Sequence, residues 1–364
     1  MRITLLSIFL TIISSISESQ SVCALTDSMI PTNRKVYMIG ETHLDGGRSY
    51  VKSKEELTVV RNALISENEI RGHLVDKCDV THFVFEAPVS NEYFYNKFLQ
   101  TGDSSWIRVF LNAEYQIGVI RNVVELAKTK EKITISCIDA DRSIYAPMVI
   151  DVLFWLTFFE PFPELFKPYT STGAPVYGYM PFAPDLLETA FYSEEPIFPF
   201  VDYVWNARTQ QIDTSSENLY KVVSNTITNK IIMTELEAFY GKNFEYVKRV
   251  LYSYYYAYNL SPDILLDLEN REQLIYNNFE YVRNKYPSGS FCIQIGAYHV
   301  MPNKTDVLSS YINNDMGLEP FNIYSIAESN AYAAKYYLKN LNYKFEGCCC
   351  YSKLSNNELL LRIK

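Results

Sequence analysis

Short runs of β-branched and aromatic residues recur along the first 140 positions, and a carboxylate follows each of them. The runs are residues 36–40, 80–85 and 133–138, and the carboxylates are Glu41, Glu86 and Asp139. Runs of this length predict buried strands, while helical spacing predicts crossover helices over 53–70 and over 106–128, where there are one or two helices, divided near Gly118 if there are two. This alternation is typical of a mainly parallel α/β sheet flanked by helices.

Residues 146–262 interrupt the alternation. An apolar helical candidate over 148–159 is followed by a stretch rich in proline and aromatic residues and then by further helical spacing. We therefore expect a large helical insertion that caps the carboxyl ends of the strands. The alternative is a membrane hairpin, but Asp151 and Glu160 interrupt its first apolar run, which is shorter than a membrane span.

After the insertion the strand and helix patterns return. Helices are expected over 264–286 and 306–312, strands over 291–296 and 321–326, and the C-terminal segment is expected to pair at a sheet edge. The predicted organisation is a first half of the α/β core at 20–145, the insertion at 146–262 and the second half at 263–364.

The N-terminal residues have the pattern of an export signal. Arg2 precedes a mostly apolar run over 3–13, and small residues suited to cleavage follow it. We expect residues 1–19 to be a signal peptide and the mature protein to be periplasmic, secreted or at the cell surface. The alternative is membrane association through an uncleaved N-terminal segment.

Charge and cysteine content narrow the function classes. The 364-residue chain has a net charge of −9 and no basic patch, so we expect no nucleic-acid partner. Its seven cysteines are an odd number and residues 348–350 are consecutive, so at least one thiol stays unpaired or binds another chain. Cys137 and Cys292 lie in strand runs, where a buried free thiol is expected.

Aromatic residues are abundant, with 30 tyrosines and 21 phenylalanines. They fit either an aromatic-lined pocket or a tyrosine-rich amphipathic surface.

Two of the four histidines follow strand ends in matching patterns. Gly40-Glu41-Thr42-His43 and Gly296-Ala297-Tyr298-His299 both read Gly-x-x-His. In a parallel sheet such ends line the ligand crevice, so folding can bring His43, His299 and the carboxylates Glu41 and Glu86 together.

Such a group is suited to hydrolysis without a covalent intermediate. His43 would take a proton from water, Glu41 or Glu86 would orient it, and His299 would steady the developing oxyanion. The same four side chains could instead hold a divalent metal, or each histidine could be structural. The sequence contains neither an H-E-x-x-H pattern nor a G-x-S-x-G elbow.

These motifs resemble a known family. Gly40–His43 resembles the Gly-Glu-x-His signature of the erythromycin-esterase-like superfamily, whose relatives include haem-uptake (ChaN-like) lipoproteins and Tiki/TraB-type metalloproteases. Gly296–His299 is similar to the late motif of the haem-uptake and Tiki branches, and Glu86-Ala87 matches the family's second strand end. Arg271 matches an arginine on the helix before the late motif.

The resemblance covers roughly residues 36–142 and 264–300. It implies an α/β fold and a site built from Glu41, His43, Glu86 and His299 with Arg271 in support. The implied function is hydrolysis of a small-molecule or peptide substrate at an ester or peptide-type bond, or else binding of haem or a metal for uptake. A fold member that acts in cell-surface interactions is a third alternative. Gly-Ala-Tyr-His is shorter than the late motif of macrolide esterases, so macrolide hydrolysis is not implied.

Overall fold

A computed structural model describes the central α/β sheet and the helices around it. The described residues are 25–42, 54–108, 114–162, 195–209, 215–258, 260, 268–301, 304–327, 339, 341 and 351–363. Residues 1–24, which include the predicted export signal, lie outside them, as do His43 and the cysteines at 348–350.

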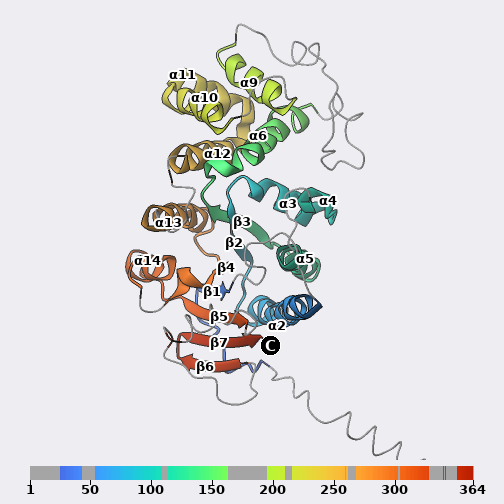
Figure 1. The fold of residues 1–364 in the computed structure, drawn as a ribbon, viewed down its shortest axis with the longest axis vertical. Helices are drawn as coiled ribbons and strands as arrows, with labels where there is room; N and C mark the ends of the chain where they lie inside the picture. The colour runs from blue at the N-terminus through green and yellow to red at the C-terminus, as the bar shows by residue number, and fades with distance from the viewer. Residues whose placement is uncertain are drawn as a thin grey trace, which may run out of the picture.

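The sheet contains seven strands in the order β3-β2-β4-β1-β5-β7-β6 (Figure 1). Their bounds are β1 Val36–Glu41, β2 His82–Pro88, β3 Thr134–Asp139, β4 Phe291–Gly296, β5 Phe321–Ala327, β6 Tyr351–Ser355 and β7 Glu358–Ile363. Neighbouring strands are parallel except β6, which runs antiparallel to β7 at the edge. The predicted α/β class is confirmed, and so is the pairing of the C-terminal segment at a sheet edge.

Helices cover both faces of the sheet. Helices α2 (Lys54–Lys77), α3 (Asn91–Thr101) and α5 (Glu114–Thr129) lie on one face, and α13 (Leu268–Lys285) and α14 (Leu308–Asn314) on the other (Figure 1). Because side chains alternate along a strand, Tyr37 and Ile39 pack in the cluster on the α2 face, and Val36 and Met38 pack in the cluster on the α13 face. Both faces of the central strands are therefore buried.

Gly118 does not break a helix, because it lies inside α5. A Cβ atom at this position would come within 2.6 Å of the Leu64 side chain on α2. Of the two alternatives, a division at Gly118 is therefore wrong, and the glycine instead permits close packing of α5 on α2.

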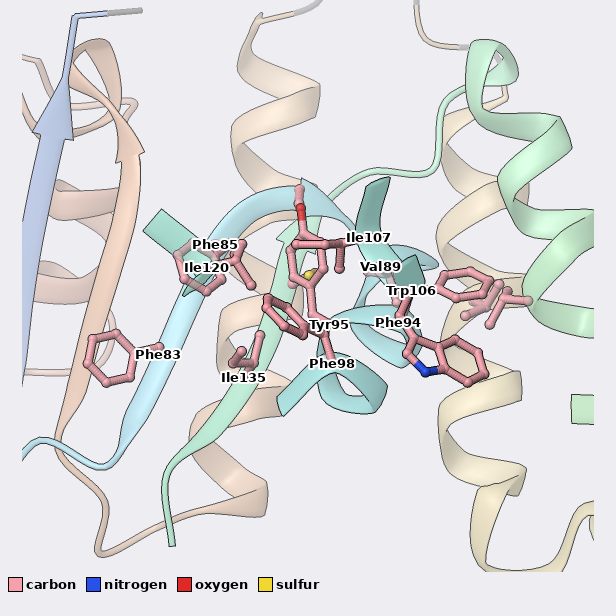
Figure 2. Packing of buried hydrophobic residues seen from close by; sticks show 14 of the residues in the cluster. Phe83, Phe85, Val89, Phe94, Tyr95, Phe98, Trp106, Ile107, Ile120 and Ile135 are labelled. Atoms are coloured by element: carbon pink, nitrogen blue, oxygen red, sulfur yellow. The ribbon is translucent and has the colours of Figure 1, made fainter. Parts of the chain in front are cut away.

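A group of helices continues the molecule beyond β3 (Figure 1). It contains α6 (Ala146–Phe154), a π-helical turn (Trp155–Phe159), α9 (Phe198–Arg208), α10 (Ser216–Thr228), α11 (Lys230–Tyr240) and α12 (Phe244–Ala257). Figure 2 shows Phe94 and Trp106, from α3 and the short α4 (Ser105–Arg108), where this group meets the core. The Trp106 ring packs edge-on against Trp155, with centroids 5.1 Å apart. The hydrophobic core is therefore continuous between the sheet and these helices.

Helix α12 covers the carboxyl ends of β2 and β3. The Tyr246 hydroxyl lies 3.0 Å from the carbonyl oxygens of Val89 and Ser90, just after β2. The Ser253 hydroxyl accepts a hydrogen bond from the backbone N–H of Asp141, just after β3, at 3.0 Å.

The outer edge of β3 is closed by side chains rather than by another strand. The Cys137 N–H donates to Glu92 Oε2 at 3.0 Å, and the Cys137 carbonyl accepts from Arg249 Nη2. Arg249 Nη1 also donates to Glu92 at 2.7 Å, so the two side chains form a buried ion pair along the strand. Asn96 Nδ2 donates to the Ile135 carbonyl at 2.9 Å. These bonds satisfy backbone groups that an edge strand would otherwise leave open.

The described cysteines are buried free thiols. Cys137 and Cys292 lie in β3 and β4 as predicted, and Cys78 lies just after α2. Burial raises the pKa of the Cys292 thiol to about 12, so it is protonated at neutral pH. Within the described ranges, no helix combines the length and apolar character needed to cross a membrane.

Candidate functional site

Four adjacent strands bring polar residues to one end of the sheet. Asp139, Glu86, Gly296 and Glu41 lie at or near the carboxyl ends of β3, β2, β4 and β1, which are neighbours in that order. Glu41 is paired in register with Gly296. The carboxyl ends of parallel strands form the usual ligand edge of such a sheet, so these residues define the candidate site.

Close packing explains both glycine motifs. A Cβ atom on Gly40 would lie 2.2 Å from Cγ2 of Val300 and 3.1 Å from Cα of Ala297. Ala297 and Val300 bound the short 3₁₀ turn that follows β4 and carries His299. Only glycine at position 40 lets this turn lie against β1, and the two Gly-x-x-His motifs are therefore in direct contact.

Glu86 is surrounded by donors. Its Oε2 accepts the Gly296 N–H at 2.6 Å, and its Oε1 contacts Arg271 Nη2 and lies 3.2 Å from His299 Nε2. These partners come from β4, from α13 and from the turn after β4. The carboxylate is therefore held in one orientation by three separate elements.

Arg271 joins Glu86 to a second carboxylate. Its Nε and Nη2 atoms donate to Oδ1 and Oδ2 of Asp139, each at 3.0 Å, in a bidentate pair. Burial alone would lower the pKa of Arg271, but the charges of Asp139 and Glu86 raise it. The remaining nitrogen, Nη1, makes no hydrogen bond with the described residues.

His299 is held between two carboxylates. Its side chain is buried, its Nδ1 forms an ion pair with Glu272 Oε1, and its Nε2 faces Glu86. Glu272 is itself fixed, because its Oε2 accepts the Leu308 N–H at 3.0 Å. Burial would lower the pKa of His299, but Glu86 and Glu272 raise it to about 10. The imidazole is therefore a cation at neutral pH and does not act as a base there.

Glu41 belongs to a second polar cluster on the α2 face of the sheet. Gln294 Nε2 donates to Glu41 Oε2 at 3.0 Å and lies 3.1 Å from Glu67 Oε2. Arg71 Nη1 donates to Gln294 Oε1 at 2.9 Å, which fixes the amide with its NH₂ group toward the carboxylates. Tyr115 donates to Glu67 at 2.5 Å, and burial and the charges of Glu41 and Glu67 raise its pKa well above the usual value.

The structure thus brings Glu86, Arg271 and His299 into one cluster and places Glu41 in another. His43 lies outside the described residues. Sequence reasoning missed Glu272, and it noted Asp139 only as the end of a strand. It also missed Glu67 and Arg71, although both share helical spacing with buried apolar residues of α2.

The donor set around Glu86 does not suit a metal ion or haem iron in this arrangement. Both ring nitrogens of His299 face carboxylates, so neither is open for coordination. In the described part of the chain, histidine, cysteine and acidic side chains form no group of three or more that could hold a metal ion.

Comparison with known proteins gives distant structural likenesses. No family model and no curated protein matches the sequence. A Bacillus cereus protein of known structure has 13% identity over 83% of this chain and 67% of its own, with a TM-score of 0.46. A succinoglycan biosynthesis protein has 14% identity over 82% of this chain and 67% of its own, with a TM-score of 0.46.

A third solved structure is a mutant of the erythromycin esterase EreC in its open conformation. It has 9% identity over 82% of this chain and 71% of its own, with a TM-score of 0.44. Identities this low, with TM-scores below 0.5, assign neither a family nor an activity to this chain.

Proposed function

We propose that this protein is a hydrolase that activates water for attack on an ester or peptide-type bond of a small-molecule or peptide substrate. The observation that carries the proposal is the convergence of two cations, Arg271 and His299, on Glu86 at the carboxyl ends of β2 and β4. Fixed cations at this edge of the sheet stabilise negative charge on a substrate oxygen without reorganising during the reaction.

In the proposed mechanism, Arg271 binds the carbonyl oxygen of the substrate. Its Nε and Nη2 atoms are engaged with Asp139 and Glu86, which leaves Nη1 to donate to that oxygen as it becomes an oxyanion. His299 adds a second fixed positive charge nearby. Glu272 and Asp139 position the two cations and make no contact with the reacting atoms.

The base in this mechanism is His43. His299 already carries its proton at neutral pH, so it does not take one from water. His43 lies two residues beyond Glu41 in the Gly-Glu-Thr-His motif, and Glu41 is anchored by Gln294. As the water oxygen bonds to the carbonyl carbon, its proton passes to His43, and the leaving group takes that proton when the scissile bond breaks.

Carriage of haem or a metal by the same residues is the competing function. A carrier that used His299 as a ligand would need one of its imidazole nitrogens open for coordination, whereas both of them face carboxylates. This arrangement favours the hydrolase.

The test is turnover of a panel of ester and peptide substrates by the purified protein, beside His43→Ala and Arg271→Gln. His73→Gln is the control, because His73 lies on α2 beside Asp27. We expect a loss of about 100-fold or more in both site variants and unchanged turnover in the control. Bound metal or haem that is lost in His43→Ala, with no turnover in the wild type, would establish the carrier instead.

We also propose that the protein is exported, on the basis of the charged, apolar and small-residue segments within residues 1–21. The mass of the protein recovered after expression of the full chain tests this. Cleavage near residue 19 is expected, and an intact N-terminus in a membrane fraction would support an uncleaved anchor.

A further inference from the structure

Four arginines are buried in the described part of the chain, and three of them have carboxylate partners. Arg71 pairs with Glu67, Arg249 pairs with Glu92, and Arg271 pairs with Glu86 and Asp139. The fourth, Arg142, is 6% exposed and forms no ion pair with the described residues.

The contacts of Arg142 do not compensate its charge. Its Nη2 donates to the Tyr145 hydroxyl over 3.4 Å, which is a long hydrogen bond, and its guanidinium carbon lies 5.5 Å from the centre of the same ring. The Nε atom is buried and has no hydrogen-bond partner. Burial of an unpaired charge with an unsatisfied donor is costly, so this position favours a negative partner that the described residues do not supply.

Arg142 lies beside the candidate site. It is three residues beyond Asp139, at the carboxyl end of β3, and it precedes the turn Ser143–Tyr145 that leads into α6. Burial and the charge of Asp139 raise the pKa of the half-buried Tyr145 hydroxyl, while Arg142 and Arg271 both oppose this. The Tyr145 hydroxyl therefore contacts Arg142 and lies within electrostatic range of the Arg271–Asp139 pair.

We propose that Arg142 and Tyr145 form a binding subsite for an anionic oxygen group, a carboxylate or a phosphate, on the molecule that the Glu86 cluster acts on. The guanidinium supplies charge and N–H donors, and the tyrosine hydroxyl supplies a further donor. The inference rests on the proposed function for one point only, namely that the anion belongs to the substrate. It specifies that substrate as negatively charged.

Anion binding is tested by measurements that do not depend on hydrolysis of a substrate. The melting temperature of the full chain is measured in sodium phosphate, sodium acetate and sodium chloride at equal ionic strength and pH, and binding constants come from titration calorimetry. Phosphate or acetate is expected to stabilise the wild type more than chloride does, and whichever binds tighter identifies the group.

Arg142→Gln is expected to weaken this binding by about 10-fold or more, and to melt no lower than the wild type in chloride because it removes an uncompensated charge. The matched control is Arg121→Gln, which removes an exposed arginine from α5 and should bind as the wild type does. Tyr145→Phe removes only one hydroxyl and should weaken binding by a few-fold, which keeps the test open if Arg142→Gln does not fold.

The subsite is refuted if phosphate and acetate stabilise the wild type no more than chloride does, or if Arg142→Gln binds them equally well. Its failure is distinct from that of the hydrolase proposal. A protein that binds the anion through Arg142 but hydrolyses nothing refutes the hydrolase alone, and one that turns over substrate without binding anions refutes the subsite alone.

Discussion

Glu272 contacts Nδ1 of His299 from the position on α13 that directly follows Arg271. Arg271 contacts Glu86, and Glu86 faces the other nitrogen of His299, so the four side chains form a series of alternating charge, Arg271–Glu86–His299–Glu272, whose two ends are neighbours on α13. Of two consecutive residues on one helix, Arg271 supplies one cation of the candidate site and Glu272 fixes the other, His299. A substitution at one member of this series should therefore change the pKa values and the stability contributions of the others.

Glu272→Gln should destabilise the protein by roughly 2 to 4 kcal/mol, because it leaves the buried imidazolium with one carboxylate instead of two. It should also lower the pKa of His299. Urea denaturation at pH 7 measures the first effect, and NMR titration of the imidazole measures the second. The matched control is Glu280→Gln on the exposed side of the same helix, which should change stability by less than about 0.5 kcal/mol. Equal effects of the two substitutions would contradict the pairing of Glu272 with His299.

His299 should make stability depend on alkaline pH. Its pKa rises from 6.5 in the unfolded chain to about 10 in the folded protein, so its contribution is fully present below pH 6.5 and is lost as pH rises toward 10. The difference in unfolding free energy between the wild type and His299→Gln should therefore shrink between pH 6.5 and 10. Denaturation curves across this range provide the measurement. Parallel pH dependence in the two proteins would show that His299 does not hold its proton.

Glu92 and Arg249 should have a large coupling free energy in their contribution to stability. Removal of the cation in Arg249→Met leaves Glu92 buried and unpaired, which should cost about 3 to 5 kcal/mol. The double variant Glu92→Gln with Arg249→Met should be less destabilised than the sum of the two single changes. A double-mutant cycle in urea measures the coupling.

The control cycle uses Glu217 and Lys221, an exposed pair on α10 at 2.7 Å. Its coupling should be no more than about 0.5 kcal/mol. A coupling of that size for Glu92 and Arg249 as well would mean that the buried pair contributes no more than a surface one.

Asp141 should lower the free energy of unfolding as the pH rises from 4 to 7. Burial raises the pKa of Asp141 to about 6. The hydroxyl and N–H of Ser90 donate to Oδ1 and oppose this increase, whereas Oδ2 is buried without a hydrogen-bond partner. The folded protein therefore keeps this proton between pH 4 and 6 when the unfolded chain has lost it. Relative to Asp141→Asn, the wild type should lose about 2 to 3 kcal/mol of stability between pH 4 and 7. A constant difference across that range would contradict the raised pKa.

The strands were predictable from the sequence because their apolar runs are continuous and each of the first three is followed by a carboxylate. Because these apolar runs are continuous, they do not show on which face of the sheet each carboxylate lies. A strand with one buried face alternates, and its pattern identifies the inward positions, but these central strands are buried on both faces. Glu41 shares a face with Ile39 toward α2, and Glu86 shares a face with Val84 toward α13. Their positions on opposite faces of the sheet separate them into two clusters.

Glu272 was missed for a different reason. Arg271 and Glu272 are adjacent charges on a helix, a pattern that is usually solvent-exposed, and nothing local indicates that both are buried. Their burial depends on contacts with residues that precede Arg271 by more than 130 positions, such as Asp139 and Glu86, and on His299 in the turn after the next strand. Motif resemblance suggested Arg271 alone.

The side chains bound to Cys137 also govern how this molecule can associate with other chains. An open strand edge is a template on which a second protein can extend the sheet. At β3 a foreign strand would have to displace Glu92 and Arg249 before it gained a hydrogen bond to Cys137. Domain swapping and fibril growth are therefore disfavoured at this edge. The opposite edge, β6, carries the exposed Lys353, whose charge discourages stacking of like strands.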